Sequence, residues 1–187
     1  MTRKVSVDNE NIFDNMFIYI GEYFVDDFRS AGFTPNMITT LSFITGILTA
    51  LLLSYSNYIT ASVVFLISYI FDCMDGTMAR KFNMETVFGD YLDHFSDITK
   101  VFLIFFVLYN NDSQKFMMLL PFIIIFALLL LTHIGCQEQE YNQEMSPSLS
   151  PTRQLCSTTS NILYTKWFGC GTYVVFMVII FLIYKFT

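Results

Sequence analysis

Four aspartates and one arginine stand close together in an otherwise apolar chain. Asp72 and Asp75 precede Arg80 in one segment, and Asp93 and Asp97 follow in the next. A carboxylate at membrane depth costs roughly 2.5 to 3.5 kcal/mol, and two of them about 5 Å apart repel by about 3 kcal/mol at an effective dielectric of about 20. One arginine cannot neutralise four such groups, whereas one or two divalent cations can. Oxygen ligands favour Mg²⁺, Mn²⁺ or Ca²⁺ over zinc, so the sequence predicts a metal site.

Helical spacing puts these carboxylates on two stripes, because residues three, four and seven positions apart share one face of a helix. The connection at 81–88 is short enough for the two helices to reverse, so that the stripes face each other. Small residues on both stripes leave room for a ligand, and Arg80 and Lys81 are suited to phosphate oxygens. We therefore predict a site for metal and diphosphate. The first stripe consists of Asp72, Asp75, Gly76 and Ala79, and the second of Gly89, Asp93 and Asp97.

The composition is typical of a membrane protein. Of the 187 residues, 54% are hydrophobic and only 14% are charged, well outside the soluble average. Lys and Arg form no large cluster, so we expect no nucleic-acid partner. The length suits a single membrane domain over residues 1–187, with nothing left for a separate soluble domain.

The predicted fold is all-α: a polytopic transmembrane bundle of about five to six spans with an N-terminal amphipathic helix. Residues 10–29 carry apolar side chains at helical spacing, which predicts a helix lying on the bilayer surface among the membrane lipids. Pro147 and Pro151 interrupt a polar stretch at 137–161, which predicts a loop. The catalytic spans fall within 37–135, at about 37–55, 58–71 (continuing through 72–80), 88–109 and 116–135, and the last span covers 167–184.

The distribution of Lys and Arg sets the orientation, because cytoplasmic loops carry the excess of positive charge. With five spans, the side that bears the aspartates holds most of the cationic residues. We therefore expect a multi-pass membrane protein whose active site faces the cytoplasm. The predicted cytoplasmic cations are Arg3, Lys4, Arg29, Arg80, Lys81, Arg153 and Lys166, against Lys115 and Lys185 on the other side.

The four cysteines form no C-x-x-C pair, and their spacing matches no zinc framework. We expect all four to be buried small residues. They are Cys73, Cys136, Cys156 and Cys170.

Four other polar residues allow two roles each. Asp90 could guide metal or acceptor, but a solvated acid at a helix start is favoured. His94 could shuttle a proton, but a local hydrogen bond is favoured. Lys100 could equally bind an anionic acceptor or offset carboxylate charge. For His133, alone after an apolar run, we expect a buried structural hydrogen bond.

The aspartate motif resembles the complete signature of the CDP-alcohol phosphatidyltransferase family. It runs Asp72-x-x-Asp75-Gly76-x-x-Ala79-Arg80, then eight residues, then Gly89-x-x-x-Asp93-x-x-x-Asp97. Thr34-Pro35-Asn36, a predicted helix start, also resembles the family pattern, and the likeness extends over residues 30–135. The family usually has six spans, whereas five are predicted here, because the polar 137–161 segment takes the place of one.

The resemblance implies which residues act. Asp72, Asp75 and Asp93 would hold two Mg²⁺ or Mn²⁺ ions, and Asp97 would complete the metal site. Asp93 and Asp97 would be the catalytic residues, with Asp97 as base on the acceptor hydroxyl. The CDP pocket would be lined by Gly76, Ala79, Arg80 and Gly89.

Three functions follow as hypotheses. The first is transfer of a phosphatidyl group from CDP-diacylglycerol to a small polar alcohol such as inositol, a glycerol phosphate or serine, with release of CMP, in phospholipid biosynthesis. The second uses CDP-ethanolamine or CDP-choline as donor and diacylglycerol as acceptor; the Asp93-His94 pair resembles that branch, but its members are usually much longer. The third is a non-catalytic cation-binding membrane protein, against which Arg80 argues, since a cation path gains nothing from a fixed positive charge. A homodimer is left open.

Overall fold

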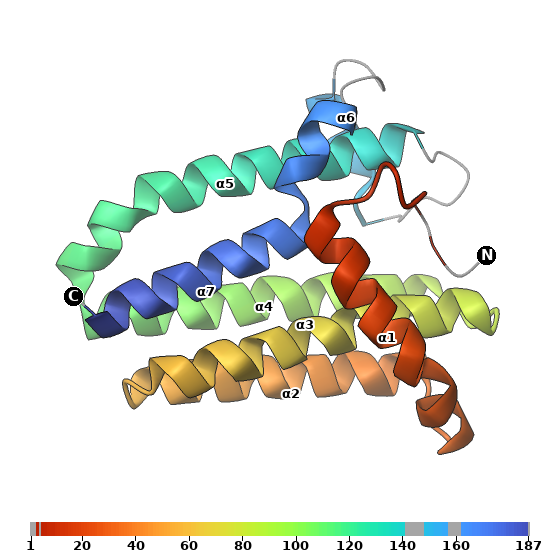
Figure 1. Ribbon diagram of the computed structural model, residues 1–187, viewed down its shortest axis with the longest axis horizontal. Helices are drawn as coiled ribbons and strands as arrows, with labels where there is room; N and C mark the ends of the chain where they lie inside the picture. Colours follow the sequence, from red (N-terminus) through yellow and green to blue (C-terminus); the bar gives the residue numbers. More distant parts are fainter. Residues whose placement is uncertain (1–2, 4, 141–147, 157–161, 187) are drawn as a thin grey trace.

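The computed structural model describes residues 3, 5–140, 148–156 and 162–186 (Figure 1). Every regular element in these ranges is a helix, which confirms the all-α prediction. The long helices lie roughly along one axis, and α1 crosses them steeply. The elements are α1 Ile12–Ser30, α2 Pro35–Ser54, α3 Tyr58–Lys81, α4 Val87–Asn111, α5 Ser113–Glu140, the 3₁₀ helix η2 Ser150–Leu155, α6 Ile162–Thr165, the 3₁₀ helix η4 Lys166–Phe168 and α7 Cys170–Phe186.

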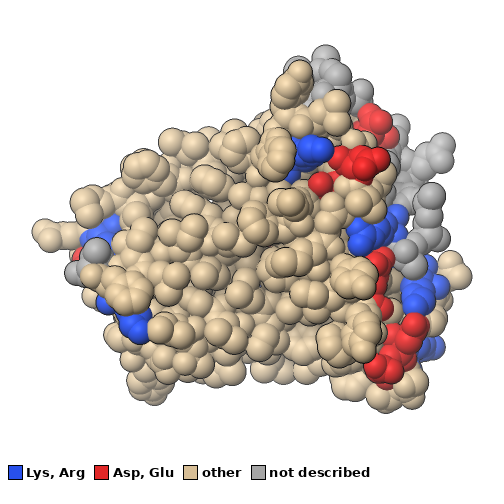
Figure 2. All heavy atoms as spheres, viewed as in Figure 1, with Lys and Arg blue, Asp and Glu red and all other residues tan. Residues whose placement is uncertain are grey.

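Four helical stretches in the described chain are long and apolar enough to cross a membrane. They are α2, α3, α5 and the continuous stretch Ile162–Phe186. The predicted third span corresponds to α4, which is not among them because its first half carries several charged residues; its crossing stays a prediction. Figure 2 shows Lys, Arg, Asp and Glu gathered at the two ends of the visible face, with a broad uncharged region between them. The chain is an integral membrane protein by these features.

Helix α1 packs across α3 through a close backbone contact. A Cβ added to Gly21 would lie 3.3 Å from Met74 Cα, so glycine is what allows this approach. The face of α1 away from the bundle exposes Met16, Tyr19 and Tyr23. Exposed apolar residues on a helix that crosses the bundle suit the predicted surface helix. Contact with lipid stays a prediction.

Tight turns set the positions of α2, α3 and α4. The predicted start of α2 is confirmed, because Thr34 caps the helix by accepting a hydrogen bond from Met37 N at 3.4 Å and Pro35 fits its first turn. The turn between α3 and α4 places Asn83 at φ 53°, and Thr86 caps α4 by accepting from Gly89 N at 3.0 Å. The predicted reversal is therefore confirmed: α3 and α4 both pack against α2, and the last turns of α3 face the first turns of α4 through their side chains.

An apolar core lies toward the opposite end of the bundle from this reversal. Leu53 of α2, Leu108 of α4 and Phe181 of α7 are fully buried in it. Asn111 Nδ2 also donates to Leu53 O at 2.8 Å. Since the helices are held together there by apolar packing, the other end of the bundle can carry polar residues.

Residues 137–161 differ in part from the predicted loop. Helix α5 continues to Glu140, and residues 150–155 form η2; residues 141–147, with Pro147, and 157–161 lie outside the described residues. The segment around η2 packs closely on α5, since a Cβ on Gly135 would lie 2.2 Å from Thr152 O.

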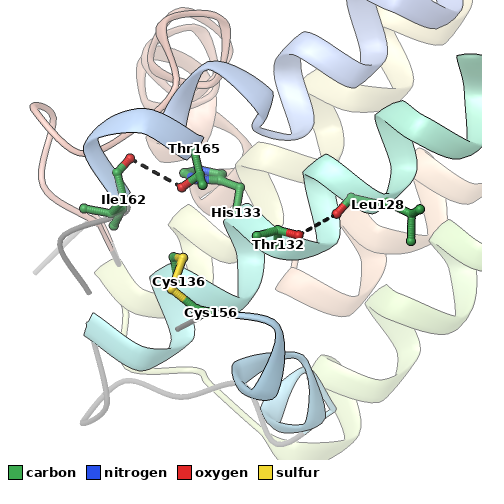
Figure 3. The surroundings of a disulfide bond; sticks show 7 residues. All are labelled: Leu128, Thr132, His133, Cys136, Cys156, Ile162 and Thr165. Carbon is green, nitrogen blue, oxygen red and sulfur yellow. Dashed lines mark hydrogen bonds between the residues drawn. A yellow bond between two sulfur atoms is a disulfide. The ribbon is translucent and has the colours of Figure 1, made fainter. Parts of the chain in front are cut away.

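The prediction that all four cysteines are buried small residues is correct only for Cys136 and Cys156, and it missed that these two are bonded to each other. Cys136 near the end of α5 and Cys156 after η2 form a disulfide across 20 residues (Figure 3). Cys73 and Cys170 are free and partly buried. The spacing of the cysteines could not show this pairing, because it depends on how η2 folds back onto α5.

Buried polar contacts join the start of α1 to the start of α7. Asn11 Nδ2 donates to Lys166 O at 2.6 Å. The Asp14 carboxylate accepts from Gly171 N at 2.7 Å and from the Tyr69 hydroxyl. Burial, followed by the negative charge of Glu10, raises the pKa of Asp14 to about 7. This junction fixes α1 against α3 and α7.

Candidate metal and diphosphate site

The carboxylates of α3 and α4 converge at the polar end of the bundle. Asp72, Asp93 and Asp97 each offer an oxygen, and these oxygens all lie within 4.8 Å of one another. Asp72 comes from α3 and the other two from α4, so the two stripes face each other as the spacing predicted. Three carboxylates this close repel one another strongly at low dielectric. The group therefore requires cationic partners.

Asp75 lies beside this group but outside it. Its side chain is buried, and its Oδ2 accepts a hydrogen bond from Thr39 Oγ1 of α2 at 2.6 Å. A hydroxyl donor to a buried carboxylate stabilises the charged form. Helix α2 thus contributes to the site, which the aspartate spacing did not indicate.

One carboxylate oxygen of Asp93 indicates that the site suits a cation. Asp93 Oδ1 is buried and has no hydrogen-bond partner among the described residues. Buried polar atoms in folded proteins are almost always satisfied. An oxygen-only ligand set with an unsatisfied carboxylate oxygen fits a hard dication such as Mg²⁺ or Mn²⁺.

Lys100 supplies an internal positive charge. Its Nζ lies 2.7 Å from Asp97 Oδ1, 3.1 Å from Asp72 Oδ1 and 2.8 Å from Ser42 Oγ. The sequence left two roles open for Lys100, and these contacts correspond to the offset of carboxylate charge.

Arg80 and Lys81, which were both predicted to face phosphate, point to different partners. A Cβ on Gly76 would lie 3.2 Å from one terminal nitrogen of Arg80 and 3.3 Å from the other, so the guanidinium lies over Gly76 on the same helix. Lys81 instead forms a 2.7 Å ion pair with Asp26 of α1. The structure therefore keeps Arg80 beside the carboxylate stripe and takes Lys81 away from it.

The remaining predicted pocket residues are small and lie next to these groups. Gly89 leaves space for α2, since a Cβ there would lie 3.0 Å from Asn36 Oδ1. Ala79 is partly buried, one turn after Asp75 and Gly76 on α3. Their contact with CDP stays a prediction.

Asp90 is not the freely solvated acid that was favoured. Its Oδ2 accepts from Ser148 N at 3.1 Å, and its side chain is only 18% exposed. Ser148, just before η2, thus lies against the first turn of α4, which the polar sequence did not show. The local hydrogen bond predicted for His94 is confirmed, because its Nδ1 lies 2.7 Å from Asp90 O. His133 is buried with its Nδ1 3.1 Å from Thr165 Oγ1, as predicted (Figure 3).

Thr39 and Ser42 are site residues that were not predicted from the sequence. Both lie in α2 on a buried stripe with Gly46 and Thr49, at spacings of three and four residues. Polar side chains inside a span usually face the bundle interior. This stripe was the signal that could have placed α2 against the site.

Carboxylates, a lysine and an arginine lie together at one end of this helical bundle. Such side chains are suited to bind a cation and a phosphate. The CDP-alcohol phosphatidyltransferase family model matches residues 33–185, nearly the whole sequence, and the chain belongs to this family. Membership supports the general reaction class, an enzyme that transfers substituted phosphate from CDP-alcohols, and the family is generally dependent on divalent metal.

An uncharacterized protein of Aquifex aeolicus (strain VF5) is similar over part of the chain. It is 29% identical over 93 residues, which are 50% of this chain and 43% of that protein. The chain thus spans less than half the length of this relative. No solved structure matches the chain.

Proposed function

We propose that the protein transfers a phosphatidyl group from CDP-diacylglycerol to a small polar alcohol and releases CMP, as a step of phospholipid biosynthesis. The observation that carries the proposal is the convergence of Asp72, Asp93 and Asp97 within 4.8 Å, in a chain that belongs to the CDP-alcohol phosphatidyltransferase family. Arg80 beside this group suits the diphosphate of the donor.

Asp72, Asp75, Asp93 and Asp97 are the residues proposed to hold Mg²⁺ or Mn²⁺. When bound, the metal would neutralise the diphosphate and stabilise the departing CMP. Thr39 holds Asp75 in place through its 2.6 Å hydrogen bond.

Asp97 is proposed as the base on the acceptor. Its side chain is 42% exposed, against 17% for Asp72, so an alcohol can reach it more easily. Its carboxylate takes the hydroxyl proton while the alcohol oxygen attacks the phosphorus of the phosphatidyl group. The bond from that phosphorus to the CMP oxygen breaks, and CMP leaves.

Small residues and Arg80 would hold the nucleotide end of the donor. A Cβ on Gly76 would lie 3.2 Å from a terminal nitrogen of Arg80, so glycine leaves room for the guanidinium and its fork of N–H donors close to the carboxylate stripe. Gly89 and Ala79 add no bulk that would exclude a diphosphate. We place this end of the bundle on the cytoplasmic side because most Lys and Arg residues lie there in the sequence.

The test is release of CMP by the purified full chain with Mg²⁺ or Mn²⁺ and CDP-diacylglycerol. Inositol, glycerol 3-phosphate and serine are supplied separately, and the product lipid is identified. Asp97→Asn should lower the rate by about 10² to 10⁴ fold. Asp112→Asn is the matched control, because Asp112 lies at the opposite end of α4 and caps α5 by accepting from Lys115 N at 2.9 Å.

Two results would contradict the proposal. CMP release only from CDP-choline or CDP-ethanolamine with diacylglycerol would establish the reversed assignment of donor and acceptor. No release from any CDP-lipid or CDP-alcohol donor would favour a non-catalytic cation-binding protein.

A further inference from the structure

Lys100 is a buried lysine to which the reaction above assigns no step. Its side chain is 7% exposed, and its ammonium lies between carboxylates of α3 and α4. We propose that Lys100 is a positioning residue: an internal cation that holds Asp72 and Asp97 together without metal and limits the site to one tightly bound dication until a nucleotide diphosphate binds. The inference rests on the metal site of the proposed function.

The Lys100 side chain packs against Gly46 of α2, where any larger residue would clash with it. Lys100 extends from α4 across the surface of α2 at Gly46. A Cβ on Gly46 would lie 2.4 Å from Lys100 Cδ and 2.5 Å from its Cγ, closer than real Cβ contacts. The aliphatic part of the side chain is thus enclosed between the two helices, which favours one position for the ammonium.

The ammonium is fully satisfied in that position. An ammonium has three N–H donors, and Nζ has three acceptors within reach: Ser42 Oγ at 2.8 Å, Asp97 Oδ1 at 2.7 Å and Asp72 Oδ1 at 3.1 Å. Ser42 is itself fixed, because its Oγ donates to Ser68 O at 3.0 Å and Ser68 Oγ donates to Ser42 O at 2.8 Å. No donor of Lys100 is left for an anionic acceptor, so its role is to hold the carboxylates.

The charges of the site give the consequence for metal binding. The carboxylates of Asp72, Asp93 and Asp97 contribute three negative charges, and Lys100 contributes one positive charge. The remaining two negative charges match one dication. A second dication would leave a net charge of plus two in a region of low dielectric. A nucleotide diphosphate carries the negative charge that removes this excess, so the second ion should bind together with the nucleotide.

The experiment counts Mn²⁺ ions bound to the full chain in detergent by electron paramagnetic resonance of free Mn²⁺. Wild type should bind one Mn²⁺ tightly without nucleotide and two in the presence of CDP. Lys100→Met should bind the first Mn²⁺ about tenfold more tightly or better and should bind a second without CDP. Its melting temperature without metal should fall and should recover with Mn²⁺, because Mn²⁺ then replaces the missing cation.

Two further variants separate this role from general damage to the fold. Lys115→Met removes the lysine of the Asp112–Lys115 pair, which has the same i,i+3 spacing as Asp97–Lys100 but lies at the opposite end of α4. It should leave Mn²⁺ binding unchanged. Gly46→Ala keeps every charge but displaces the Lys100 side chain, so it should tighten Mn²⁺ binding in the same direction as Lys100→Met. It decides the question if Lys100→Met does not fold.

The outcomes separate this inference from the proposed function. The inference would be overturned if wild type bound two Mn²⁺ ions tightly without CDP, or if wild type and Lys100→Met bound the same number of Mn²⁺ ions with the same affinity. If the same wild-type preparation released CMP, the proposed function would still hold. Conversely, changed Mn²⁺ binding in Lys100→Met without CMP release from any donor would support the inference and refute the function. Unchanged Mn²⁺ binding in folded Gly46→Ala would also count against Lys100.

Discussion

The hydrogen bond from Thr39 to Asp75 offers a measurable test of how the site is held. Both residues are buried, at 3% and 5% exposure, and Thr39 Oγ1 lies 2.6 Å from Asp75 Oδ2. Thr39→Val removes the donor but keeps the branched shape. A hydrogen bond to a charged group contributes about 1.5 to 3 kcal/mol. We expect Thr39→Val to lower the free energy of unfolding by that amount in protein without metal, at a pH high enough for the buried Asp75 to be ionised.

Unfolding by sodium dodecyl sulfate titration in mixed micelles, followed by circular dichroism, measures this difference. Thr39→Ser retains the hydroxyl and should cost much less than Thr39→Val. In an Asp75→Asn background the carboxylate charge is absent, so Thr39→Val should cost only about 1 kcal/mol, the value of a neutral hydrogen bond. The difference between the two backgrounds isolates the charged interaction.

One contrary result is that Thr39→Val and Thr39→Ser have the same stability within about 0.5 kcal/mol. The other is that Thr39→Val costs as much with Asp75→Asn as with Asp75. Either result would mean that the hydroxyl does not stabilise the Asp75 carboxylate.

Three further predictions concern the parts that support the site. Gly171→Ala places a Cβ 2.7 Å from Asp14 N, so thermal unfolding should show a loss of about 1 to 3 kcal/mol. Because the pKa of Asp14 is raised to about 7, the folded state binds a proton on Asp14 more tightly than the unfolded state. The free energy of unfolding should therefore rise as pH falls from about 7 to 4, by up to about 1.4 kcal/mol per pH unit. Asp14→Asn should reduce this pH dependence. The disulfide closes a segment of 20 residues, so a Cys136→Ser/Cys156→Ser protein should lose about 3 kcal/mol in equilibrium unfolding and should no longer respond to dithiothreitol. Gly171→Ala as stable as wild type would contradict the close contact of Gly171 with Asp14. A pH slope unchanged by Asp14→Asn would contradict the raised pKa of Asp14. A double serine protein that reductant still destabilises would contradict the stabilising role of the disulfide.

Much of the scaffold of the site could be predicted because it depends on local patterns. The start of α2 at Pro35 follows from its capping threonine and proline, and the reversal between α3 and α4 follows from the short connection. Helical periodicity then suffices to bring Asp72 toward Asp93 and Asp97. These features need no knowledge of distant contacts.

The partners of the carboxylates could not be predicted as easily. Helix α2 is apolar on most of its surface, and only its stripe of small and hydroxyl residues indicates which face turns toward α3 and α4. Thr39 and Ser42 meet the site only because of that rotation. The role of Lys100 was left open for the same reason, since its acceptors lie on three different helices.

The Cys136–Cys156 disulfide and the contact of Ser148 with Asp90 depend on the chain after α5. That segment is polar and has no periodicity, so the sequence indicates only that it is exposed. Its return to α5 and α4 is set by tertiary contacts. Predictions for this region were accordingly the least successful, while those for the aspartate stripes rested on regular helix geometry.

Crystals of the full chain grown with Mn²⁺ would show by anomalous diffraction whether carboxylates of α3 and α4 share a dication. We expect an anomalous peak within about 2.5 Å of oxygens from Asp72, Asp93 and Asp97. A peak elsewhere in the protein, or no peak in contact with these three carboxylates at saturating Mn²⁺, would contradict a shared dication.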